Sequence, residues 1–172
     1  MKINRIAALF LTAVVTVALL SSCSLFKRDD RTRINVLMVT GNFFDSRLIC
    51  ELAQYKTKQP IIVVDPESNG AVSIYYAPSS EAKTIQIANE EFGDFIDHLN
   101  PRTIAVMGGS KFVPANILDI LNKKNGNVVQ LTNDDWEKNA HALGVMLNQD
   151  RLVRTYREYR EKFIQAGELP AN

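Results

Sequence analysis

The stretch INVLMVTGNFFDSRLICELAQYKTKQPIIVVD, residues Ile34 to Asp65, decides the fold of this chain. Its first part, Ile34 to Thr40, is an almost continuous run of apolar, largely branched residues, which is typical of a strand buried on both faces. A turn follows, and Asp45 to Lys58 then carries apolar residues at helical spacing. Because Ile61 to Asp65 is a second apolar run of strand length, the stretch predicts a strand, a crossover helix and a parallel strand.

The same alternation continues toward the C-terminus. Two segments, Ala71 to Pro78 and Lys83 to Ala88, alternate like more exposed strands. Helices and strands are then expected in turn, with two helices at the end, over residues 90–99, 102–108, 114–124, 128–132, 133–147 and 150–166. The order predicts an α/β fold, a three-layer Rossmann-like or flavodoxin-like sandwich with a mainly parallel sheet. We expect one α/β domain over residues 34–166, followed by a C-terminal tail over residues 167–172.

The N-terminal residues have the composition of an export signal. Lys2 and Arg5 form a short basic end, and Ile6 to Leu20 is apolar apart from two threonines. That run has the length of a signal-peptide core and is shorter than the roughly 20 apolar residues that a spanning helix needs. It ends in Leu20-Ser21-Ser22-Cys23, which resembles a bacterial lipobox. The alternatives are an ordinary secretory signal with a chance cysteine and an uncleaved anchor.

A lipobox implies cleavage before Cys23 and transfer of a diacylglyceryl group to its thiol. We therefore expect residues 1–22 to be a cleaved signal peptide, and residues 23–33 to be the lipidated cysteine and a short charged tether. Each buried methylene contributes about 0.8 kcal/mol, so two or three acyl chains hold a protein on a membrane. We expect a lipoprotein of the bacterial cell envelope, on an outer membrane facing the periplasm if the organism has one, and otherwise at the cell surface.

Charge and cysteine content narrow the class further. Loss of residues 1–22 removes Lys2 and Arg5 and changes the formal net charge from +1 to −1, a balance that gives no attraction to nucleic acid. If Cys23 carries lipid, only Cys50 remains, so no internal disulfide can form. Cys50 lies in a helical pattern and is expected to be a small buried residue.

Polar residues and glycines follow the predicted parallel strands, at the edge where open α/β sheets bind ligands. The candidate ligand-binding residues at this edge are Asn42, Asp45, Asp65, Gly108, Gly109, Ser110 and Asp135. Each has an alternative explanation. The two glycines suit a tight turn between strand and helix, because glycine lacks the side chain that would clash there. Asp45 and Asn133 suit helix caps.

The motifs of common enzymes are missing from the sequence. It contains no Gly-x-Ser-x-Gly elbow, no phosphate-binding loop, no dinucleotide fingerprint and no histidine or cysteine pair at metal spacing. We therefore expect no enzymatic activity, no cofactor and no metal.

The last helix, over residues 150–166, carries four arginines together with two tyrosines: Arg151, Arg154, Arg157, Arg160, Tyr156 and Tyr159. Steps of three residues spread the arginines over a broad face, and Glu158 and Glu161 are placed to pair with them. The helix is expected either to be solvated and docked by its aromatic side or to offer a surface to a glycan, an anionic polymer or a partner.

Three segments resemble the cell-wall-binding repeat 2 family of Gram-positive surface proteins. Val36 to Asp65 is similar to the family's strand, Gly-x-x-Phe-x-Asp turn, helix and strand. Ile104 to Leu121 is similar to its strand, Gly-Gly turn and helix, and Val128 to Leu143 stands where the family has an Asp-Arg-Tyr-x-Thr-Ala signature. Asp135 and Ala140 match that signature, whereas Trp, Glu and Asn replace its Arg, Tyr and Thr.

The resemblance implies a Rossmann-like module that, in trios, holds anionic cell-wall polymers. We therefore expect a lipid-anchored, non-enzymatic envelope protein that binds wall polymer or an envelope partner, and that forms a homotrimer because only one module is present. The alternative is a domain that binds a small sugar or phosphate ligand at the carboxyl ends of its strands. An unrecognised hydrolase that depends on Asp45 or Ser110 is a third hypothesis.

Lipidation at Cys23 predicts that the native protein carries label when cells are fed radiolabelled palmitate. Replacement of Cys23 by Ala should abolish the label, because the acceptor thiol is lost. A native chain that is water-soluble and unlabelled would contradict the anchor.

Overall fold

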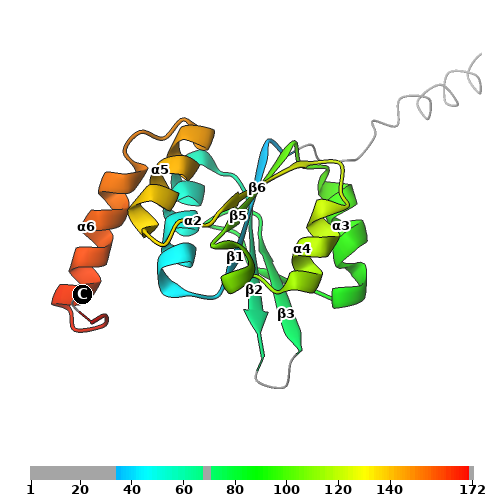
Figure 1. The fold of residues 1–172 in the computed structure, drawn as a ribbon, viewed down its shortest axis with the longest axis horizontal. Coiled ribbons are helices and arrows are strands. Elements are labelled where there is room, and N and C mark those ends of the chain that lie inside the picture. Colours follow the sequence, from blue (N-terminus) through cyan, green and yellow to red (C-terminus); the bar gives the residue numbers. More distant parts are fainter. Residues whose placement is uncertain (1–33, 68–70, 171–172) are drawn as a thin grey trace, which may run out of the picture. The chain divides into compact units, whose positions relative to one another are not determined.

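The computed structural model describes residues 34–67 and 71–170, and these residues form an α/β fold around one mixed sheet (Figure 1). The α/β class that the sequence predicts is confirmed. The predicted signal peptide, the lipidated Cys23 and the tether lie outside the described residues. Among the described residues, no helix combines the length and the apolar character that crossing a bilayer requires.

The helices and strands lie where the sequence predicts them, with ends that differ by a few residues. The strands are β1 (Val36–Gly41), β2 (Ile61–Pro66), β3 (Val72–Ala77), β4 (Ile85–Ile87), β5 (Thr103–Met107) and β6 (Asn127–Leu131). The α-helices are α2 (Phe44–Thr57), α3 (Phe92–Leu99), α4 (Ala115–Asn122), α5 (Trp136–Leu147) and α6 (Leu152–Gln165).

The described strands form one six-stranded sheet in the order β4-β3-β2-β1-β5-β6. The strands β2, β1, β5 and β6 are parallel, whereas β3 is antiparallel to β2 and β4 is antiparallel to β3. The sheet is therefore mixed, although its four-stranded part is parallel as predicted. The reason is the length of the connections, since only a few residues join β2 to β3 and β3 to β4, and a parallel pair needs a crossover of a dozen or more.

Side chains of the central strands alternate between two apolar cores. Leu37 and Val39 of β1 belong to a core under α3 and α4, together with Phe92 and Leu121. Met38 of β1 belongs to a second core under α2 and α5, together with Ile49 and Leu143. Every residue of β1 is buried, which is why its sequence is apolar on both faces.

The last helix does not lie on the sheet. It packs against α2 and α5 and forms an outer layer on that side of the molecule (Figure 1). Leu152 is 4% exposed and Tyr156 is 1% exposed, so α6 docks through this apolar side, as the simpler prediction stated.

The end of β1 carries a tight steric constraint. A Cβ atom added to Gly41 would lie 2.2 Å from the backbone oxygen of Phe112, in the loop that follows β5. A backbone group cannot swing aside as the end of a long side chain can. Gly41 therefore permits the loops after β1 and β5 to touch.

We expect Gly41→Ala to lower the free energy of unfolding by about 1–3 kcal/mol, because the new methyl group must displace backbone. The matched control is Gly93→Ala in α3, where the nearest atom is the flexible end of Lys124 at 3.3 Å. That change should leave stability unchanged or slightly raise it, because alanine favours a helix. Urea unfolding followed by circular dichroism compares the two, and equal midpoints would contradict the constraint.

Candidate functional site

The carboxyl ends of β1 and β5 lie side by side at the centre of the sheet, because these two strands pair in parallel. The helix after β1 covers one face and the helix after β5 covers the other, so the order of strands reverses between them (Figure 1). In open α/β sheets this position is the usual ligand crevice.

Phe112 fills this position. A Cβ atom added to Gly108 would lie 2.3 Å from the Phe112 ring, and one added to Gly109 would lie 2.5 Å from the side chain of Thr132. Both glycines also have positive φ angles, 81° and 58°. The turn therefore needs glycine twice for steric reasons, and the cavities described below do not include Gly108, Gly109 or Ser110 in their linings.

The other candidate residues separate into two groups. In the first, the amide nitrogen of Asn42 donates to Asp65 at 3.2 Å, and Arg47 donates to the amide oxygen of Asn42 at 2.9 Å. Arg47 also pairs with Glu51 at 2.6 Å. These side chains line one end of a cavity of about 300 Å³ between α2 and the uncovered face of β2 and β3. The prediction that Asn42 and Asp65 lie close together is thus correct.

Asp45 belongs to the second group, and it does not cap its helix. The N-cap of α2 is Phe43, which makes no side-chain cap bond. The carboxylate of Asp45 instead accepts a hydrogen bond from the hydroxyl of Tyr156 at 2.5 Å and one from Nε of Arg160 at 3.2 Å. The cap interpretation failed because both partners come from α6, more than 100 residues later in the chain.

The cap of α5 is Asp135, whose carboxylate accepts from the backbone N–H of Glu137 at 2.9 Å. Asn133, which the sequence predicts as a cap, accepts from the backbone N–H of Asp135 at 3.0 Å and so shapes the turn before the helix. The buried amide of Asn139 holds the same turn by bonding the backbone N–H and C=O of Asn133. Asp135 is therefore a cap as well as a residue at the carboxyl edge.

A polar cavity of about 380 Å³ opens between the start of α5 and the outer helix α6. Its lining combines acidic residues with an arginine and two aromatic rings, namely Asp134, Asp135, Trp136, Glu137, Tyr156 and Arg160. We call this cavity the α5–α6 pocket. Asp45 lies at its base through its bonds to Tyr156 and Arg160.

Three ionisable groups of the α5–α6 pocket have shifted pKa values. The hydrogen bond from Lys111, at 2.7 Å, lowers the pKa of the exposed Asp134. Burial and the hydrogen bond to Asp45 raise the pKa of Tyr156 well above its usual value, so the phenol keeps its proton and donates to the carboxylate. The two hydrogen bonds from Arg157 to Glu137, at 2.9 and 2.6 Å, lower the pKa of Glu137. Glu137 therefore stays charged at neutral pH.

Three aromatic rings lead from the centre of the carboxyl edge to the α5–α6 pocket. The rings of Phe43 and Phe112 meet edge to face at 4.8 Å, and the rings of Phe112 and Trp136 meet edge to face at 5.1 Å. Phe43 is 43% exposed, and the other two rings are half-buried. We call these residues the aromatic strip. The sequence analysis missed it, although each ring follows closely behind a parallel strand.

The arginines of α6 are mostly paired. Arg154 bonds Glu158 at 2.8 Å, Arg157 bonds Glu137 and Arg160 bonds Asp45. The predicted pairing with Glu158 is confirmed, and the predicted broad arginine surface is partly neutralised. Arg151 is the exception among the four, since it forms no ion pair with any described residue.

The remaining reactive side chains of the described residues lie apart from this edge. Cys50 is fully buried, as predicted, and burial raises the pKa of its thiol far above its usual value. His98 and His141 lie in α3 and α5. Among the described residues, no group of three or more His, Cys, Asp or Glu is placed to hold a metal ion.

Comparisons with protein-family models, with curated proteins and with solved structures found no match to this chain.

We expect Tyr156→Phe to lower the free energy of unfolding by about 1–2 kcal/mol, because the partly buried carboxylate of Asp45 loses a short hydrogen bond. Tyr159→Phe is the matched control, since this ring lies on the same helix and is 42% exposed. Its loss of a hydroxyl should change stability by less than about 0.5 kcal/mol. Equal urea midpoints for the two variants would contradict the role of the Tyr156 hydroxyl.

Proposed function

We propose that this chain is a lipid-anchored, non-enzymatic protein of the bacterial cell envelope, and that its α/β domain binds wall polymer through the carboxyl edge of the sheet. The signal sequence that ends at Cys23 supports the anchor. The aromatic strip beside the α5–α6 pocket supports the binding site.

The observation that carries the proposal is the combination of an exposed ring and two half-buried rings with a polar cavity. A sugar ring has one face of C–H groups, which packs on an aromatic ring whose face is electron-rich. Its hydroxyl groups need hydrogen-bond partners at the rim, and Asp134 and Arg160 are of this kind. The successive rings from Phe43 to Trp136 suit a chain of sugars better than a single one.

Binding without chemistry fits the polar groups of the α5–α6 pocket. Asp45 is held by Tyr156 and Arg160, and Glu137 is held by Arg157. A general acid or base must be free to exchange a proton with a substrate, whereas these carboxylates are engaged in structural bonds.

We further propose that the sheet belongs to the Rossmann-like or flavodoxin-like group. The support is the parallel order β2-β1-β5-β6 with its reversal between β1 and β5. The antiparallel β3 and β4 extend one side of this core. The resemblance to cell-wall-binding repeats rests on the same three strand-and-helix segments, and a homotrimer of single modules stays part of this proposal.

A small ligand is the second candidate. The volume of the α5–α6 pocket, about 380 Å³, lies within the range of small-molecule sites, roughly 300–1,000 Å³. Thermal shift against a library of sugars and sugar phosphates separates the two candidates, because only this one predicts that a single small molecule raises the melting temperature.

The wall-polymer proposal predicts that the native protein sediments with purified peptidoglycan bearing its wall polymer. The double variant Phe43→Ala, Trp136→Ala should bind about fivefold to 150-fold more weakly, because each stacked ring contributes about 0.5–1.5 kcal/mol and two rings are removed.

The control is Tyr159→Ala. Tyr159 lies outside the aromatic strip, and its ring is about as exposed as that of Phe43, at 42% against 43%. It should sediment like the native protein. No sedimentation of the native protein at low salt would refute wall binding, and an equal loss in all variants would refute the role of the aromatic strip.

A further inference from the structure

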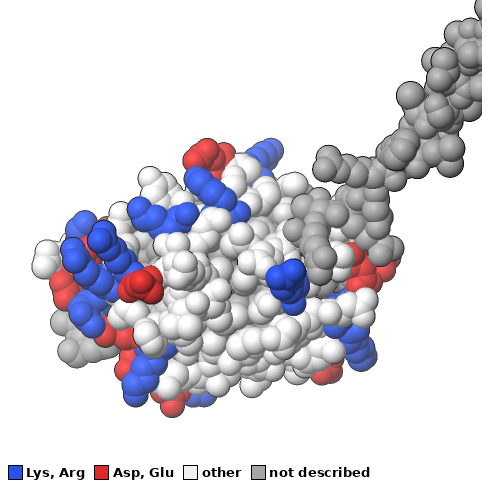
Figure 2. Space-filling model, turned by 90° about the horizontal axis from the view of Figure 1, so that it is seen from above, with Lys and Arg blue, Asp and Glu red and all other residues white. Residues whose placement is uncertain are grey.

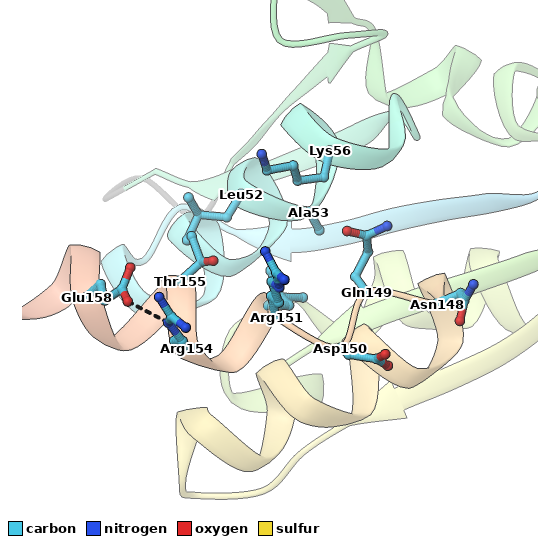
Figure 3. A pocket seen from close by; sticks show the side chains of 11 residues that line it. Leu52, Ala53, Lys56, Asn148, Gln149, Asp150, Arg151, Arg154, Thr155 and Glu158 are labelled. Carbon is cyan, nitrogen blue, oxygen red and sulfur yellow. Dashed lines mark hydrogen bonds and ion pairs between the residues drawn. The ribbon is translucent and has the colours of Figure 1, made fainter.

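A second cavity, of about 470 Å³, lies at the opposite edge of the sheet from the aromatic strip. It opens between the last turns of α2 and the start of α6 (Figure 3). Three basic side chains line it, Lys56 from α2 and Arg151 and Arg154 from the start of α6. Thr155 and Gln149 add a hydroxyl and an amide. We call it the basic pocket.

Two of the three cations have no carboxylate partner. Among the described residues, neither Lys56 nor Arg151 forms an ion pair, and Lys56 contacts only the ring of Tyr55, at 5.3 Å. Arg154 shares its charge with Glu158 at 2.8 Å. Figure 3 shows the carboxylate of Asp150 turned away from Lys56 and Arg151. Asp150 and Glu158 also line the basic pocket, so its three cations exceed its two carboxylates by one charge.

The basic pocket lies at the amino edge of the parallel strands. Lys56 is in the last turn of α2, and the next residues reach the start of β1, where the side chain of Gln59 accepts from the N–H of Val36 at 2.9 Å. Figure 2 views the molecule from above, onto this edge, and Lys and Arg side chains lie over the part that α2 and α6 form. The chain also enters the sheet at this edge, through Ile34.

We propose that the basic pocket binds a phosphate group through Lys56, Arg151 and Arg154, and that the headgroups of anionic phospholipids in the anchoring membrane supply it. The headgroup source rests on the proposed lipid anchor at Cys23, whereas the phosphate site does not.

The chemistry of the lining fits a phosphate. Ammonium and guanidinium groups form charge-assisted hydrogen bonds with phosphate oxygens, and a guanidinium can bond two of them at once. The hydroxyl of Thr155 and the amide of Gln149 can bond the remaining oxygens. Carboxylates of wall peptides also bind ammonium and guanidinium groups. The cavity is open between α2 and α6, so it also admits a phosphate that carries the rest of a lipid headgroup.

The position fits the membrane as the source. A segment of eleven residues, from 23 to 33, spans at most about 40 Å, which lets Ile34 and the amino edge reach the headgroups to which Cys23 is proposed to be anchored. Anionic lipids attract basic side chains within about a Debye length of the surface. Phosphate binding at the amino edge would then turn the aromatic strip away from the membrane, toward the wall.

The first arm of the test uses the native lipidated protein in a nonionic detergent, with inorganic phosphate titrated against chloride at constant ionic strength. Phosphate should raise the melting temperature in a saturable way. The double variant Lys56→Gln, Arg151→Gln should weaken the apparent affinity for phosphate at least about tenfold. The matched control is Lys123→Gln, Lys162→Gln, which removes the same charge outside the basic pocket and should bind like the native protein.

The second arm identifies the source. The native protein is inserted in phosphatidylcholine vesicles with or without phosphatidylglycerol, and acetylation of each lysine is followed by mass spectrometry. Phosphatidylglycerol should slow the acetylation of Lys56 several-fold and leave Lys162, in the last turn of α6, unchanged.

Each result decides one part. No saturable effect of phosphate and no protection of Lys56 would overturn the site. Stabilisation by phosphate without protection in phosphatidylglycerol vesicles would overturn the membrane as its source. The double variant should still sediment with wall polymer, so a failure of wall binding and a failure of the basic pocket are separate results.

Discussion

The fold depends on the burial of β1 on both faces. All six residues of this strand are buried, with Leu37 facing the core under α3 and α4 and Met38 facing the core under α2 and α5. A strand of this kind is stable only at the centre of a sheet with helices on each side. The helix α2 begins at the carboxyl end of β1 and returns the chain to the amino end of β2. The direction of β1 therefore defines the carboxyl edge and the amino edge, at which the candidate sites lie.

The outer helix α6 forms part of the wall of both candidate pockets. Its contact with the rest of the molecule depends on Tyr156, whose ring is buried and whose hydroxyl bonds the carboxylate of Asp45. Removing a carboxylate from water is costly unless hydrogen bonds and a positive charge accompany it, and Tyr156 and Arg160 supply both to the partly buried Asp45. The α5–α6 pocket and the basic pocket each take one wall from α6, so both proposed sites require this docking.

The two edges of the sheet differ in chemistry. The carboxyl edge carries aromatic rings and paired carboxylates, which suit the apolar face and the hydroxyl groups of a sugar. The amino edge carries Lys56 and Arg151, which form no ion pair with any described residue. If the proposed anchor at Cys23 is present, the domain that begins at Ile34 would connect the membrane to the wall. Phe112 closes the usual crevice between β1 and β5, and the proposed binding surface therefore lies further along the carboxyl edge, at the aromatic strip and the α5–α6 pocket.

The sequence by itself determined the secondary structure and the parallel core, because hydrophobic periodicity and connection length are local properties. It placed Asn42 beside Asp65 correctly, since both follow adjacent parallel strands. It left Asp45 as either a ligand-binding residue or a helix cap and could not foresee its bond to Tyr156, because this partner on α6 is far away in the chain. Only the tertiary structure decided which arginines form no ion pair, which rings meet and where cavities open. These properties depend on the packing of helices that are far apart in the sequence and share no local signal.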